Sequence, residues 1–178
     1  FREGKVEMMK NTNNVRIVMR DLAGGSLNPE DYSFEVTDDN TYFGADNYLL
    51  PSAYGEVTYI PWAKGDIHYG ISGDVSVSGA YAEFSVSRLM KPDAEAGRKS
   101  TEARLRVVDK EDDRAIIDVP LVDMLMLSRS DYYADMDEQE FLDRQSEWEL
   151  LFFIDNGRWV QVWIKVQDWI VKYNRADL

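Results

Sequence analysis

The chain has 178 residues and no cysteine, and 33 acidic residues against 20 basic ones give a formal net charge of −13. This charge disfavours binding to nucleic acid and to anionic lipid headgroups, and the lack of cysteine excludes disulfides, thiol catalysis and Cys-ligated metal. With 44% hydrophobic and 12% aromatic residues the chain is a folded globular domain, and no run is apolar for long enough to span a bilayer.

Alternation of apolar and polar residues with a period of two predicts strands over residues 15–20, 32–37, 83–87 and 102–107. Strands with one polar face are typical of antiparallel sheets that pack on one side, as in a β-sandwich. The apolar phase of these strands, and of the last strands below, predicts a core that contains Ile17, Phe34, Phe84, Leu105, Val162 and Ile164.

Residues 38–73 show little period and are rich in Asp, Asn, Gly, Pro and Tyr, so long loops and short edge strands are expected there. A short helical insertion is predicted near residues 120–148. Pro120 can begin a first helix, and Asp137 with Glu140 three residues later resembles a capping box for a second. There is no internal repeat or linker, so residues 1–178 are expected to form a single domain.

The last thirty residues predict a β-meander. The Asn156-Gly157 step between two apolar runs is a strong hairpin signal, and Gln167-Asp168 is a second two-residue loop. Such a short loop should fold the strand Trp169–Tyr173 back on its own predecessor. We therefore expect the chain to end a polymer rather than extend it: the purified domain should stay monomeric yet bind a peptide copied from a donor strand.

Two tryptophans of this meander are the candidate contact residues. Over residues 159–166 the apolar phase is Val160, Val162, Ile164 and Val166, which places Trp159 and Trp163 together on the other, less apolar face. Exposed aromatic rings suit a sugar or a partner strand. The alternative is that a helix or loop covers them and makes this face a second core.

The residues that could form a catalytic or metal site are explained more simply by structural roles. His68 is the only histidine and no nucleophile motif accompanies it, so an ordinary strand or loop histidine is expected. The stretch 38–47 fails the spacing of a calcium loop and fits Asx turns, so no calcium dependence is expected. The acidic runs 109–113 and 135–140 favour a solvated turn and a helix start over a glycosidase carboxylate pair. We expect no catalytic residue, cofactor or metal, and no enzyme.

Several segments, in this order and spacing, resemble the second domain of the fimbrillin-associated anchor proteins of Bacteroidales-type fimbriae. They are Lys10–Ile17, Leu27–Asn40, Asp46–Pro51, Ile116–Leu121 and the closing hairpin Trp159–Leu178. The resemblance implies a transthyretin-like antiparallel β-sandwich, here with the helical insertion near residues 120–148. It also implies the carboxy-terminal domain of a two-domain, secreted lipoprotein of the outer membrane, which tethers the fimbrial shaft through strand addition.

Phe1 is not an initiator methionine, so the chain looks like a processed protein or a fragment. Any signal peptide would lie upstream of Phe1, and so would the lipid anchor that the resemblance implies, which is the only expected attachment to the membrane. The expected partners are fimbrial shaft or accessory subunits at the cell surface. The alternative function is a surface or tip adhesin that binds a glycan or a host protein, since related sandwiches serve both roles.

Overall fold

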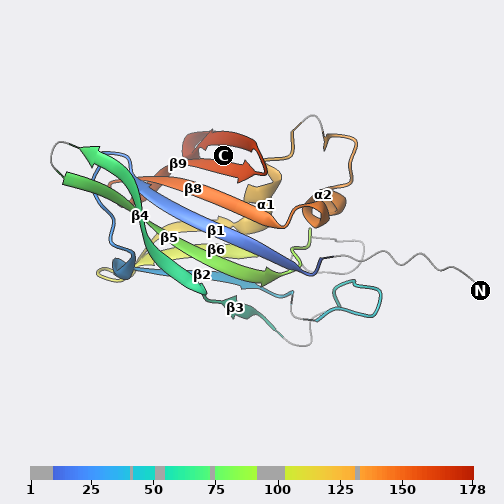
Figure 1. The fold of residues 1–178 in the computed structure, drawn as a ribbon. Coiled ribbons are helices and arrows are strands. Elements are labelled where there is room, and N and C mark those ends of the chain that lie inside the picture. The colour runs from blue at the N-terminus through green and yellow to red at the C-terminus, as the bar shows by residue number, and fades with distance from the viewer. Residues whose placement is uncertain (1–9, 41, 51–54, 73–74, 92–102, 131–132) are drawn as a thin grey trace, which may run out of the picture.

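The computed structural model describes residues 10–40, 42–50, 55–72, 75–91, 103–130 and 133–178, and these form two stacked β-sheets (Figure 1). In spatial order, the six-stranded sheet contains β10 (Trp169–Asn174), β9 (Arg158–Val166), β8 (Glu147–Asp155), β1 (Thr12–Asp21), β5 (Val75–Ser87) and β4 (Ala63–Ser72). The four-stranded sheet contains β3 (Val57–Tyr59), β2 (Tyr32–Asp38), β6 (Arg104–Asp109) and β7 (Arg114–Pro120). The predicted β-sandwich is confirmed. Its strand pairs are antiparallel apart from β1 and β8, which run parallel.

The core lies between the two sheets and is built from the inward phase of nearly every strand. All six residues that the sequence predicts for the core are buried, at 4% exposure for Phe34 and 1% or less for the others, which are Ile17, Phe84, Leu105, Val162 and Ile164. Burial of such side chains is the main favourable contribution to folding.

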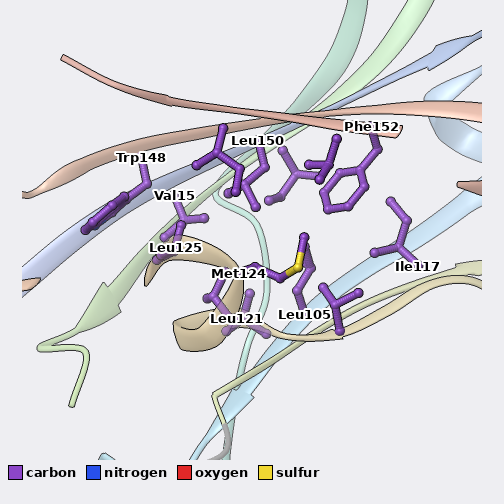
Figure 2. Close-up of a cluster of buried hydrophobic side chains, with 14 of the residues drawn as sticks. Val15, Leu105, Ile117, Leu121, Met124, Leu125, Trp148, Leu150 and Phe152 are labelled. Atoms are coloured by element: carbon purple, nitrogen blue, oxygen red, sulfur yellow. The ribbon is translucent and has the colours of Figure 1, made fainter. Parts of the chain in front are cut away.

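Two short helices close one part of this core. In α1 (Leu121–Met126), Leu121, Met124 and Leu125 are buried, and Figure 2 shows them among side chains of both sheets, including Leu105 and Leu150. The predicted helical insertion is thereby confirmed. It is completed by α2 (Glu138–Arg144).

The start of α2 follows the sequence prediction. The Asp137 side chain accepts hydrogen bonds from the backbone amides of Gln139, at 2.9 Å, and Glu140, at 3.2 Å. Arg144 donates to Glu140 at 2.5 Å, as the i,i+4 spacing predicts. Two 3-10 turns, η1 (Pro29–Asp31) and η3 (Arg175–Asp177), complete the described elements. No helix among the described residues is long and apolar enough to cross a membrane.

The expectation for residues 38–73 is partly wrong. A three-residue edge strand, β3, does occur there, but residues 63–72 form the ten-residue strand β4 at the edge of the large sheet. The segment alternates only weakly, because the apolar phase begins with the small residues Ala63 and Gly65 before it reaches Ile67. A Cβ at Gly65 would stand 3.0 Å from the Tyr81 ring of β5, so any larger residue would require that ring to shift.

The predicted β-meander is confirmed, since β8, β9 and β10 pair antiparallel in sequence order. Asn156 and Gly157 both have positive φ, 49° and 69°, as a tight hairpin turn requires. The strand Trp169–Tyr173 is used within its own chain, because β10 pairs with β9 over six consecutive residues.

Candidate partner-binding surfaces

The free edge of β10 is one candidate surface. β10 pairs with β9 on one side and is the last strand of the sheet on the other. Its register with β9 is unbroken from Trp169 to Asn174, and Trp169 and Ile170 are 59% and 52% exposed. A regular edge strand with exposed apolar side chains is a template for pairing with another strand.

The other described edges carry features that discourage such pairing. β4 has a register shift between His68 and Gly70, and the exposed side chains among its residues 63–68, which are Asp66 and His68, are polar. Lys64 of β4 forms an ion pair of 3.1 Å with Glu30. β3 has only three residues, and β7 carries an ion pair between Asp118 and Arg104 of its neighbour β6. Irregularity, charge and shortness all protect edges, so β10 is the least protected of the four.

The outer face of the six-stranded sheet, which points away from the core, is the second candidate surface. Here Trp163 of β9 packs on Phe153 of β8, with ring centroids 4.9 Å apart, and Lys172 Nζ of β10 lies 3.8 Å from the Trp163 ring centroid. Phe153 and Val18 of β1 are buried although neither belongs to the main core. The rings of this face are thus partly covered by their own neighbours.

Trp159 does not share that face with Trp163, so this phase assignment is wrong. Pairing between β8 and β9 shifts register between Phe153 and Ile154, and beyond the shift Trp159 lies opposite Ile154 on the core side. Trp159 is 5% exposed, and its ring packs edge-on against Phe152 with centroids 5.7 Å apart. Trp163, which is half-buried, remains on the outer face as a contact candidate.

An open hollow of about 370 Å³ lies on the same outer face. A charged row crosses it from strand to strand: Lys165 pairs in register with Glu149, Glu149 with Arg16, and Arg16 with Glu83. Trp62, which directly precedes β4 and is 67% exposed, also lines the hollow.

Sequence reasoning missed Trp62. It falls in the stretch 38–73, which shows little period and for which only long loops and short edge strands were expected. The signal that could have identified it is the pair of large apolar residues, Ile60 and Trp62, on either side of Pro61. Both are well exposed in the structure, at 77% and 67%.

The polar side chains of the stretch 38–47 form turns and hydrogen bonds to neighbouring segments. Asp46 accepts the Tyr48 amide at 3.2 Å, as an Asx turn does. Asn40 donates to the Arg88 carbonyl at 3.1 Å and accepts from the Tyr59 hydroxyl at 2.7 Å. Burial raises the pKa of the Asp38 carboxyl to about 7. These contacts hold the loop against β3 and the end of β5.

The remaining sequence candidates are structural or exposed. His68 lies exposed on the edge strand β4. In the acidic run 109–113, Asp109 accepts the Glu111 amide at 2.9 Å and Asp112 accepts the Arg114 amide at 3.1 Å, so these carboxylates shape the turn between β6 and β7. The run 135–140 provides the cap of α2, as the sequence predicts.

Comparison with known proteins gives a consistent picture. The family described as "Fimbrillin-A associated anchor proteins Mfa1 and Mfa2" matches residues 1–175. The solved structure of a candidate adhesin from Bacteroides thetaiotaomicron VPI-5482 has 45% sequence identity and a TM-score of 0.83, over 98% of this chain and 56% of that one. No curated protein matches the chain.

Two further solved structures show the same fold at lower identity. A candidate polysaccharide-binding protein from Bacteroides thetaiotaomicron VPI-5482 has 23% identity and a TM-score of 0.67, over 96% of this chain and 53% of that one. The fimbrial anchor protein Mfa2 from Porphyromonas gingivalis has 18% identity and a TM-score of 0.55, over 90% of this chain and 48% of that one. The chain thus spans about half the length of the solved structures that it matches.

The family match covers nearly the whole chain, and the two-sheet architecture agrees with it. This family consists of fimbrial structural and anchor proteins and is not an enzyme class. The chain belongs to the family of fimbrillin-A associated anchor proteins Mfa1 and Mfa2.

Proposed function

We propose that this chain is a structural subunit that anchors or assembles a surface fimbrium and that it accepts a strand from a shaft or accessory subunit at the free edge of β10. Family membership supports the fimbrial role. The observation that carries the mechanism is the β10 edge: it is regular, lacks a described neighbour on one side, and exposes Trp169 and Ile170. An incoming strand would gain main-chain hydrogen bonds along it and contacts with these side chains.

The two-residue loop before β10 indicates which amides are free. A tight hairpin turn closes on a hydrogen-bonded pair, here Val166 with Trp169, and such pairs alternate along an antiparallel ladder. We therefore expect the amides of Ile170 and Lys172 to point away from β9 toward an incoming strand. These two groups are the donors that strand addition would use first.

In the parent protein we place this domain as the carboxy-terminal half of a two-domain lipoprotein, exported and held at the outer membrane by a lipid anchor in the preceding part. The solved structures that the chain matches are about twice its length, which supports a second domain. The domain would then stand at the base of the fimbrium and bind its first shaft subunit.

One pair of variants tests the edge. Ile170→Pro removes the outward amide together with the side chain, whereas Ile170→Ala removes most of the side chain and keeps the amide. The ligand is a peptide copied from the terminal strand of a fimbrial shaft subunit, and its affinity is measured by calorimetry. We expect Ile170→Pro to weaken binding at least tenfold and Ile170→Ala to weaken it only a few-fold. Equal binding by Ile170→Pro and wild type would exclude this edge.

An adhesin that binds a glycan or a host protein is the second candidate function. It is supported by the 45% identity to a candidate adhesin and by the exposed aromatic side chain in the hollow of the outer face. The two functions use different surfaces of the domain, so a single chain could perform both.

A further inference from the structure

We propose that the hollow on the outer face of the six-stranded sheet binds a neutral saccharide, with Trp62 as the stacking platform. The inference supplies a site and a ligand class for the second candidate function, on which it rests, and it does not depend on strand addition at β10. It is carried by three features of the hollow: an exposed aromatic ring on a backbone tied to the sheet, a row of partly exposed charged groups joined by long ion pairs, and the sign of the local charge.

Trp62 presents an exposed side chain from a backbone that is tied to the sheet. Its backbone amide donates to the carbonyl of Glu83 on β5 at 2.9 Å, just before β4 begins, so its backbone is tied to the sheet. The side chain is 67% exposed and lines the hollow. An aromatic ring presented in this way offers an apolar face to the C–H groups of a sugar ring, with an indole N–H as a polar partner.

The charged row beside Trp62 is incompletely paired. Arg16 lies 3.5 Å from a Glu83 oxygen and 3.7 Å from a Glu149 oxygen, both longer than a good hydrogen bond. The Arg16 side chain is 38% exposed although its Nε is buried, so the outer part of the guanidinium is what a ligand in the hollow can reach. Glu149 and Glu147 also lie on the hollow, with side chains 36% and 68% exposed. Sugar hydroxyls both donate and accept, so they can use the carboxylates and the guanidinium together.

The charge of the hollow and the length of its charged row indicate which class of ligand fits. The hollow is lined by three carboxylates, of Glu83, Glu147 and Glu149, against two cations, Arg16 and Lys165. This excess and the chain's net charge of −13 disfavour sulfated or sialylated glycans. The row crosses three strand spacings, from β9 to β5, or about 14 Å. That length suits a short oligosaccharide, while a protein interface would need a wider apolar centre.

The test uses indole N–H signals in NMR spectra of the chain. Neutral oligosaccharides of glucose, galactose, mannose and N-acetylglucosamine are titrated, beside sulfated and sialylated counterparts. We expect at least one neutral oligosaccharide to shift the Trp62 signal and to leave in place that of Trp169, the indole on β10 that is 59% exposed against 67% for Trp62. Trp62→Ala should weaken this binding at least tenfold with an unchanged melting temperature, while Trp169→Ala binds as wild type. Glu149→Ala should weaken it at least threefold.

The proposal is overturned if no neutral oligosaccharide binds at millimolar concentration, if the charged glycans bind better, or if Trp62→Ala retains wild-type affinity. A host protein that competes for Trp62 while saccharides do not would overturn it as well. Ile170→Pro, the variant that tests strand addition, should leave saccharide binding unchanged. The two proposals can therefore fail separately.

Discussion

Arg88 and Asp143 form a two-point ion pair, in which Arg88 Nε donates to one carboxylate oxygen at 2.7 Å and a terminal nitrogen donates to the other at 2.6 Å. Their side chains are only 4% and 17% exposed. The pair joins the residue that follows β5 to α2, 55 residues later in the chain. Arg88 also donates to the carbonyl of Asn47, so one guanidinium ties a loop and a helix to the sheet.

Removing this guanidinium should destabilise the domain strongly. Arg88→Met removes the charged partner of Asp143, which keeps the weaker hydrogen bond of 3.1 Å from the Gln139 side-chain amide, and it removes the Arg88 donor to the Asn47 carbonyl. We expect a loss of about 3 kcal/mol in the free energy of unfolding. Urea denaturation measures it. The matched control is Arg144→Met, which breaks an exposed pair with Glu140 and should cost less than about 0.5 kcal/mol. Equal effects of the two variants would show that the Arg88 pair is no stronger than a surface pair.

The stability of the domain should depend on pH through Asp38, which is 2% exposed. Burial, reinforced by the neighbouring Asp39 charge, raises the pKa of the Asp38 carboxyl to about 7, so the folded state retains a proton that the unfolded chain releases near pH 4. The folded state binds more protons between these two values. Its stability therefore falls as pH rises from about 4 to about 7, and this contribution is constant above that range.

Asp38→Asn isolates this effect, because asparagine stays neutral and can still accept the Asp39 amide, now bonded to Asp38 at 2.8 Å. As pH rises from about 4 to about 7, we expect the free energy of unfolding of the variant to increase by a few kcal/mol relative to that of the wild type. Urea denaturation of both proteins at each pH measures this difference. At pH 4 the two proteins should be nearly equal. A difference that does not change with pH would contradict the raised pKa.

The hairpin turn between β8 and β9 should tolerate alanine at Gly157 poorly because of its backbone conformation. Gly157 has φ +69°, and we expect Gly157→Ala to cost about 1 kcal/mol in stability. An added Cβ would also meet the Arg114 guanidinium, but this flexible group can move aside. Gly24 has φ +86° and open space around it, so Gly24→Ala is the control and should lower the stability by the same amount. Rescue of Gly157→Ala by Arg114→Ala, in thermal melts, would show that the clash dominates instead.

Two neighbouring positions on β9 should respond very differently to a carboxylate. Ile164 is fully buried, so Ile164→Asp places an unpaired charge in the core and should abolish the folded state. Lys165 is exposed on the outer face opposite Glu149, so Lys165→Asp should cost only about 1 kcal/mol from like-charge repulsion. Circular dichroism and melting temperatures distinguish the outcomes. A folded Ile164→Asp protein with an unchanged melting temperature would contradict the strand phase.

Local signals allowed the sequence to predict β8, β9 and β10, because Asn156-Gly157 fixes one turn and alternation fixes the inward phase at Val162 and Ile164. The predicted face of Trp159 was wrong, because the pairing of β8 with β9 shifts register next to Phe153. The alternation within a single strand does not reveal such a shift. β4 was missed because an edge strand with Gly65 and exposed polar residues lacks strong alternation. Nor could the sequence predict the pair of Arg88 and Asp143, since only the folded chain brings them together.

The central claim is that β10 presents a free edge to a partner strand, and amide hydrogen exchange tests it most directly. The domain is compared with and without the terminal-strand peptide of a shaft subunit, and the amides of Ile170 and Lys172 are followed by NMR. In the free domain we expect both amides to exchange rapidly, and with peptide bound we expect them to exchange at least tenfold more slowly. The exchange rates of the β4 amides should not change. Protection of β4 instead, or no protection at β10 under saturating peptide, would contradict the account.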